Sequence, residues 1–183
     1  MFELIQTKRT DPRLLERMEN HYSKPKGFVG RNICYAVYYN NEYYGHIVGG
    51  SATRFLPGRN EFLEMDLSSL NSVVNNIFYN VSPVREKYPI RNFTSRVVKE
   101  FVDNIKVDWK NKYGDEVIGF ETLVEKPRTG ELYKRAGWEK VGETVGYTCK
   151  RTAGKGTDGW HGKRVWCTDK EKLRPKIVLC LKA

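Results

Sequence analysis

The period of the hydrophobic pattern changes near the middle of the chain, and this change constrains the fold most strongly. Residues 91–112 carry polar side chains on one side, including Lys99 and Asp103, and end before Gly114. The apolar residues of this segment recur at helical spacing: Val97, Val98, Phe101, Val102, Ile105 and Trp109. Such spacing predicts an amphipathic helix with one face in a core.

Strand-like segments lie on both sides of this helix. Runs rich in β-branched and aromatic residues predict strands over 32–39, 43–52, 73–81, 117–124 and 176–182, and strand followed by turn over 138–148. Shorter helices are predicted over 13–19 and 129–136, and residues 56–70 are expected to be irregular. This order predicts an α/β (α+β) domain with a mostly antiparallel central sheet flanked by helices.

The first two strands are expected to form a hairpin. Asn40 and Asn41 give a turn signal between them. The second strand contains several glycines, which predict either a β-bulge or the close approach of another segment.

The length and charge of the chain bound its organisation and its partners. A chain of 183 residues fits a single domain over 1–183, and its net charge of +10 favours a polyanionic partner. Residues 150–176 contain nine basic and three acidic side chains, with Trp160, His161 and Trp166 among them. Nucleic acid is the first expectation, contacted through this segment and through Lys163 and Arg164 in particular. The alternatives are a soluble basic enzyme and a solvated loop whose tryptophans pack inward.

Cysteines and targeting signals are consistent with a cytoplasmic protein. Cys34, Cys149, Cys167 and Cys180 form no CxxC pair, and the three histidines have no familiar ligand spacing, so no metal site is predicted. No signal peptide and no membrane-length apolar run are seen, so no membrane association is expected. The oligomeric state is left open, and a homodimer is compatible with the sequence.

One segment resembles a known superfamily. Residues 130–144 read Gly-Glu-Leu-Tyr-Lys-Arg-Ala-Gly-Trp-Glu-Lys-Val-Gly-Glu-Thr. This run resembles the late helix–strand unit of the acyl-CoA N-acyltransferase-like (GNAT-like) superfamily, whose tyrosine often lies near the thioester. The resemblance implies an acyl-CoA donor, such as acetyl-CoA, and matches Tyr133 to that tyrosine.

A second segment makes the resemblance more specific. His21, Tyr22 and Ser23, followed by Gly30 and the hairpin, look like the start of the phage Mom family of DNA-modification proteins. A related group of phage-defence proteins begins similarly and carries a strand like residues 120–124. Over residues 17–150, this resemblance implies transfer of a small acyl-derived or carbamoylmethyl-type group to adenine N6 of double-stranded DNA. Such a modification would protect phage DNA from restriction in the host cytoplasm.

The segment before the central helix departs from ordinary members of the superfamily. It contains Arg91, Asn92, Thr94, Ser95 and Arg96 but no glycine, where those members place a Gly-rich pyrophosphate loop. These five residues are the predicted cofactor-binding group. Thr94 and Ser95 are expected to cap the helix, and the arginines to pair with phosphate. The Mom-type proteins share this deviation.

Four residues are the predicted catalytic group: His21, Tyr22, Glu121 and Tyr133. His21 is expected to be a general base, the alternative for the His21–Tyr22 pair being an exposed loop. Glu121 lies among apolar residues and is either an acid/base group or the structural partner of an arginine. Tyr133 is either the proton donor to the leaving group or a core tyrosine.

Further residues are expected to contact the substrate. Tyr22 or Trp138 could stack on a flipped base, and Ser23 lies beside the first of them. Asn75 and Asn76 should point to opposite faces of their strand, one into the cleft to read adenine by two hydrogen bonds and the other to the surface.

Three classes of function follow from these residues. The first is Mom-like modification of adenine in DNA. The second is an ordinary acyl-CoA-dependent N-acyltransferase acting on protein, RNA or a small amine. The third is a non-catalytic DNA-binding accessory in phage defence. The fold alone does not distinguish them.

Overall fold

The computed structural model describes residues 2–22, 27–80, 92–146, 149–151, 164–166 and 173–183. A seven-stranded sheet has the order β1-β2-β3-β4-β5-β9-β6, and only its β4–β5 pair is parallel. The strands are β1 (Phe2–Thr7), β2 (Asn32–Tyr39), β3 (Glu42–Ser51), β4 (Val73–Asn80), β5 (Gly119–Glu125), β6 (Glu139–Glu143) and β9 (Lys176–Lys182). The helices are α1 (Pro12–Asn20), α2 (Arg59–Phe62), the 3₁₀ helix η1 (Leu67–Ser72), α4 (Phe93–Tyr113) and α5 (Glu131–Lys134).

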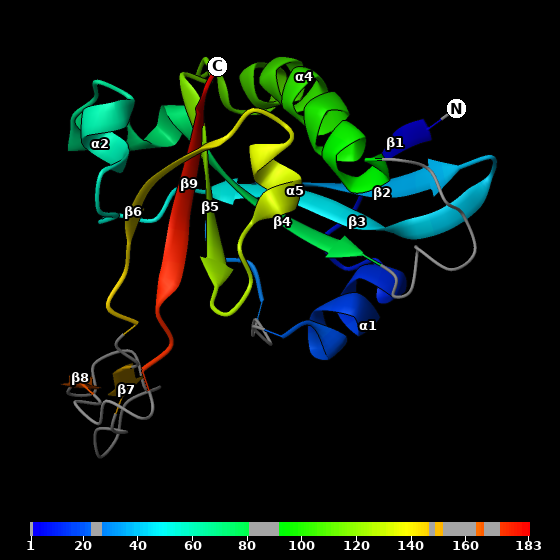
Figure 1. Ribbon diagram of the computed structural model, residues 1–183. Coiled ribbons are helices and arrows are strands. Elements are labelled where there is room, and N and C mark those ends of the chain that lie inside the picture. Colours follow the sequence, from blue (N-terminus) through cyan, green and yellow to red (C-terminus); the bar gives the residue numbers. More distant parts are fainter. Residues whose placement is uncertain (1, 23–26, 81–91, 147–148, 152–163, 167–172) are drawn as a thin grey trace, which may run out of the picture.

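Helices cover both faces of this sheet (Figure 1). The long helix α4 buries its apolar face, including Val97, Phe101 and Trp109, against one face, where α5 also packs. On the opposite face, Leu14 and Met18 of α1 form a smaller cluster with strand residues. The sheet therefore has two cores, and burial of apolar area on each face stabilises the arrangement.

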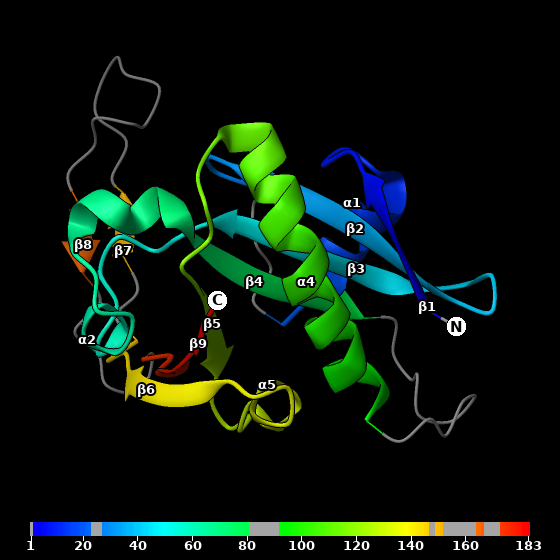
Figure 2. The same cartoon turned by 90° about the horizontal axis from the view of Figure 1, so that it is seen from above.

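The sheet opens between its two parallel strands. Val73–Asn75 of β4 pair with Gly119–Glu121 of β5, and the pairing ends there. Beyond that point β4 stays paired with β3 as far as Asn80, and β5 stays paired with β9 as far as Glu125. The two strands thus diverge at their carboxyl ends: β4 runs under α4, and β5 runs toward α5 (Figure 2).

Most predicted elements are confirmed with small shifts at their ends. The central helix, the hairpin and the last strand all form. Asn40 and Asn41 make the turn of the hairpin, with positive φ values of 49° and 63°. Both expectations for the glycines hold: the register shifts opposite Gly45, and a Cβ on Gly49 would lie 2.6 Å from Ile105 of α4. Here α4 approaches the sheet so closely that only glycine fits.

In and around the seven-stranded sheet, three elements were not predicted. β1 pairs antiparallel with β2 at the edge of the sheet, and residues 56–70 form α2 and the start of η1 rather than irregular chain. α2 follows Gly58, where φ is 73° and a Cβ would lie 1.9 Å from the Val141 carbonyl of β6. Such tertiary contacts leave little signal in local composition.

The basic segment is described only in part. Two described parts of it lie in a separate two-stranded sheet of β7 (Cys149–Arg151) and β8 (Arg164–Trp166), and its last residue, Lys176, begins β9. Cys34 and Cys180 are buried, as expected. Within the described ranges, no helix has the length and apolar character needed to span a membrane.

Candidate active site

A cavity of about 790 Å³ lies where β4 and β5 diverge. Its walls include residues of both strands beyond their last paired positions, together with the C-terminal end of α1, the start of α4 and the β5–α5 connection. The strand residues are Asn75, Ile77, Phe78, Tyr79, Thr122, Leu123 and Val124. Alternation places Phe78 and Val124 in the core under α4, and Ile77 and Tyr79 on the α1 side. The cavity therefore reaches both faces of the sheet.

On the α4 side the cavity wall is mainly apolar and ends at Tyr133. Phe78 and Thr122 lie beside Tyr133 in this wall. Thr122 donates to the Asn76 carbonyl at 2.7 Å, which bridges the two diverging strands. Burial raises the pKa of Tyr133, so its hydroxyl keeps its proton near neutral pH.

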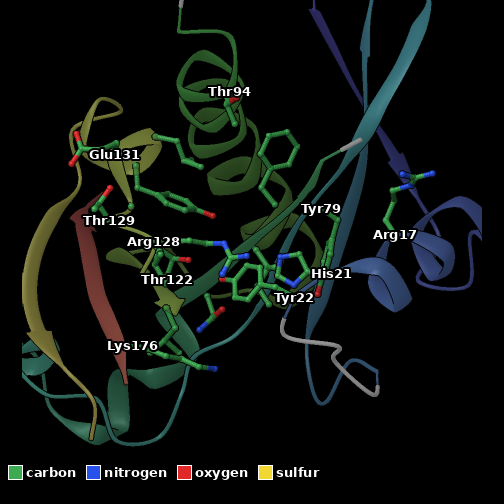
Figure 3. Close-up of a pocket in the computed structure, with 18 of the residues that line it drawn as sticks. Arg17, His21, Tyr22, Tyr79, Thr94, Thr122, Arg128, Thr129, Glu131 and Lys176 are labelled. Atoms are coloured by element: carbon green, nitrogen blue, oxygen red, sulfur yellow. The ribbon is translucent and has the colours of Figure 1, made fainter. Parts of the chain in front are cut away.

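On the α1 side the cavity opens through a ring of aromatic and cationic groups, here called the mouth: His21, Tyr22, Tyr79, Arg128 and Lys176 (Figure 3). The Arg128 guanidinium lies 3.8 Å from the centre of the Tyr22 ring. The His21 ring lies 4.2 Å from Tyr22 and 5.0 Å from Tyr79. The segment after α1 therefore reaches across the gap to the β5–α5 connection.

The mouth holds its histidine uncharged. Burial, and then the cations Arg128 and Lys176, lower the pKa of His21 to about 4. His21 is consequently neutral at pH 7 and a weaker base than an ordinary histidine. Its role as a general base stays a prediction.

The end of the cavity where the strands separate rests on a buried ionic network, here called the base. Glu121 is fully buried, and Arg59, also fully buried, donates to its Oε2 at 2.6 Å. Its Oε1 accepts from the Thr53 backbone N–H at 2.6 Å and from Asn75 Nδ2 at 2.8 Å. Glu121 does not line the cavity, which agrees with the alternative of a structural pair with an arginine. Asn75 does line it.

Two substrate predictions are wrong as stated. Asn76 is fully buried rather than at the surface, and its Nδ2 donates to the Val48 carbonyl. Trp138 is 2% exposed and packs against Tyr133 and Phe120, so it cannot stack on a flipped base. Tyr22 remains a stacking candidate, but Arg128 covers one face of its ring.

The predicted cofactor group is only partly brought to the cavity. Thr94 lines it, whereas Ser95 faces the core and is 5% exposed. Neither caps α4: the N-cap is Asn92, with a φ of 58°, and its side chain does not bond to the helix backbone. Arg96 lies exposed on the first turn. The cap prediction fails because Thr94 and Ser95 are the second and third residues of the helix.

Several predicted contacts lie outside the described residues. These are Ser23, Arg91 and Lys163. Arg164 belongs to β8, but its side chain is not described. Their roles stay predictions. In the described part of the chain, no cluster of His, Cys, Asp or Glu could hold a metal ion.

Sequence reasoning missed several residues of the site. Arg59, Tyr79 and Arg128 come together only through the tertiary fold. Alternation from Asn75 would have placed Tyr79 on the same face of β4, which is the one local signal available. Arg59 lies in a segment expected to be irregular, 62 residues from the acid that it neutralises.

The fold matches that of solved acetyltransferases. A Bacillus subtilis acetyltransferase in complex with CoA aligns over 100% of this chain and 99% of its own, with a TM-score of 0.59 and 12% identity. The aminoglycoside acetyltransferase AAC(6')-Ib with coenzyme A and kanamycin aligns over 100% and 95%, with a TM-score of 0.55 and 15% identity. The Escherichia coli ribosomal-protein-S18-alanine N-acetyltransferase aligns over 100% and 94%, with a TM-score of 0.52 and 10% identity.

These likenesses establish the fold. The chain has the acyl-CoA N-acyltransferase-like architecture of GNAT acetyltransferases, as the sequence predicted. No protein-family model matches the sequence, and no curated protein matches it. Nothing in these comparisons supports the Mom family in particular, so that resemblance stays a prediction.

Proposed function

We propose that this protein is an acyl-CoA-dependent N-acyltransferase. The observation that carries the proposal is the cavity between the diverging strands, which reaches both faces of a sheet shared with acetyltransferases solved with CoA. A cavity of this kind lets an acyl donor enter from one face and an amine from the other. The reacting atoms would meet where β4 and β5 separate.

The residues on the α4 side fit an acyl-CoA. Thr94 lies at the start of a 21-residue helix whose first turn carries no acid, so the partial positive charge of that helix end is available to a phosphate. Phe78 and Val124 offer apolar walls to an acyl chain. Beyond Asn75 and Glu121 the two strands do not pair with each other, which leaves backbone groups for an extended amide chain.

The chemistry is a balanced acyl transfer. The bound thioester supplies an acyl carbon to which an amine nitrogen bonds as the C–S bond breaks, and the proton lost from nitrogen balances the one gained by sulfur. Tyr133, which keeps its proton at neutral pH, is placed to protonate the leaving sulfur. Neutral His21 is placed on the amine side, where it can accept a hydrogen bond without repelling the nucleophile.

Transfer from acetyl-CoA is the direct test. Purified protein would be incubated with acetyl-CoA and a panel of aromatic amines, alkyl amines, peptides and nucleic acids. We expect thiol release coupled to a product heavier by one acetyl group in mass spectrometry. Saturable binding of acetyl-CoA with no transfer to any class of acceptor would reject the catalytic part of the proposal.

A second proposal specifies the acceptor: the amino group of adenine in DNA, as the resemblance to Mom-type proteins implies. The mouth supports it, because Arg128 and Lys176 suit phosphates and Tyr22 is a stacking candidate, and the chain carries a net charge of +10. On this proposal the modification protects phage DNA from restriction.

Nucleoside mass spectrometry tests the second proposal. Plasmid DNA from bacteria expressing the protein should contain a nucleoside heavier than deoxyadenosine, and a His21→Ala variant should reduce it. Unmodified plasmid together with acetyl transfer to another amine would leave the first proposal standing and remove the second. Tight DNA binding with neither reaction would favour the non-catalytic accessory.

A further inference from the structure

Asn75 is the one residue that belongs to both the base and the cavity. It lines the cavity on the same face of β4 as Tyr79, two pleats away, and so lies on the amine side. Its Nδ2 lies 2.8 Å from Glu121 Oε1 and 3.4 Å from Thr53 Oγ1. Among the described residues, no group donates to its Oδ1.

The orientation of this amide is fixed by chemistry. A carboxylate can only accept hydrogen bonds, so the Asn75 NH₂ group must face Glu121 and the oxygen must face away. Arg59 donates to Glu121 Oε2 and the Thr53 N–H donates to Oε1, so both carboxylate oxygens are acceptors in a site removed from water. Asn75 therefore directs its acceptor, Oδ1, into the cavity, while its donor, Nδ2, faces Glu121.

This arrangement overturns the expectation that Asn75 reads adenine by two hydrogen bonds. Such readout needs the amide nitrogen and oxygen to face the base together. In this structure the nitrogen is already bonded to Glu121. One hydrogen bond, to Oδ1, is left for a ligand.

We propose that Asn75 determines acceptor specificity by accepting one N–H of a neutral primary amine. This inference rests on the proposed acyl transfer. A primary amine has one N–H for Asn75 and a second to lose when the new C–N bond forms. A hydroxyl or a secondary amine has a single hydrogen on its reacting atom. If this hydrogen is bonded to Asn75, the proton that must leave during acyl transfer is held by a side-chain amide oxygen, which is too weak a base to remove it.

The mouth explains why the amine is neutral. Burial, and then Arg128 and Lys176, lower the pKa of His21, and the positive field of these two cations also opposes an ammonium group. An amine whose lone pair is free at pH 7, such as an aromatic amine, avoids this repulsion. An anionic group elsewhere on the same molecule would meet the cations of the mouth.

The probes are three benzoates that differ only at nitrogen: 4-aminobenzoate, 4-(methylamino)benzoate and 4-(dimethylamino)benzoate. Each carries the same carboxylate and an uncharged nitrogen at neutral pH, and the third has no N–H. Binding would be measured by calorimetry with and without CoA, so no transfer is needed. We expect the first two to bind about tenfold more tightly than the third. This ratio corresponds to the free energy of one hydrogen bond at a partly buried site.

Three variants make the test specific. Asn75→Leu removes the acceptor, and the three affinities should become equal. Glu121→Gln leaves Asn75 in place but frees its amide to reverse, and the preference should fall in the same direction. Leu123→Met changes a neighbouring lining residue without a polar group and should retain the tenfold preference. Unfolding transitions would be recorded for each variant.

The outcomes separate this inference from the proposed function. A tenfold preference that disappears in Asn75→Leu supports it, and so does acetyl transfer to 4-aminobenzoate with none to its N-methyl form. Equal affinities in the wild type, a preference that survives in Asn75→Leu, or no binding of any benzoate overturns it. If acetyl-CoA gives no transfer while the preference behaves as expected, the proposed function fails and the Asn75 contact stands.

Discussion

The base and the mouth of the cavity both contain cationic side chains, but they use them differently. At the base, Arg59 and Glu121 are fully buried, and both carboxylate oxygens are hydrogen-bonded. At the mouth, Arg128 is exposed, stacks on Tyr22 and forms no ion pair with any described residue. Charges removed from water therefore fix the geometry of this site, whereas charges left in water are available to a ligand.

The largest effect is expected at the base. Arg59→Met would leave Glu121 buried without its cation, and we expect a loss of about 3–5 kcal/mol in the free energy of unfolding. Urea unfolding measures it. The exposed pair Lys110–Glu116 is the control, where Lys110→Ala should cost about 0–1 kcal/mol. Similar losses for both variants would mean that the base is no more important than a surface pair.

The next effect separates chemistry from binding. Tyr133→Phe removes the proton donor while leaving the ring in its core position, so kcat should fall by roughly 10²–10⁴. The KM for acetyl-CoA should change little, because the hydroxyl acts on the leaving sulfur. Steady-state thiol release gives both constants. An unchanged kcat would make Tyr133 a core tyrosine only.

A smaller effect is expected at the mouth. Arg128→Ala should weaken binding of an anionic aromatic amine by about tenfold, with little change in unfolding, because the side chain is exposed. The difference from wild type should shrink as salt is raised. Calorimetry at low and high salt checks this, with Lys110→Ala again as the control. Loss of stability without loss of affinity would mean that Arg128 stabilises the fold and does not bind the ligand.

The last effect concerns pH. The pKa values of His21 and His46 are lowered from 6.5 to about 4, mainly by burial, so below about pH 6.5 the unfolded chain binds more protons than the folded one. The free energy of unfolding should therefore fall as pH drops from about 6.5 to 4. Replacing the fully buried His46 by Gln should make this decline shallower. A decline of equal steepness in that variant would contradict the assignment.

The sequence predicted the base and the mouth to different extents. Local sequence pattern found the central helix, which buries one apolar face, and most of the strands, which are rich in β-branched and aromatic residues. It also indicated that Glu121, alone among apolar residues, needs a partner. Arg59 could not be identified, since its segment has no periodic pattern, and neither could the Arg128–Tyr22 contact, which joins two loops. Asn76 and Trp138 were misplaced because a polar or aromatic residue in a strand carries no local sign of which layer covers it.

Binding of acetyl-CoA to the cavity between β4 and β5 is the central claim, and a calorimetric titration tests it most directly. Two variants of the same helix would be compared with the wild type: Thr94→Trp, which fills the cavity, and Val107→Trp, on its 60% exposed side. We expect one acetyl-CoA per chain for the wild type and Val107→Trp, and at least tenfold weaker binding for Thr94→Trp. No binding by the wild type, or equal affinity in all three proteins, would contradict it.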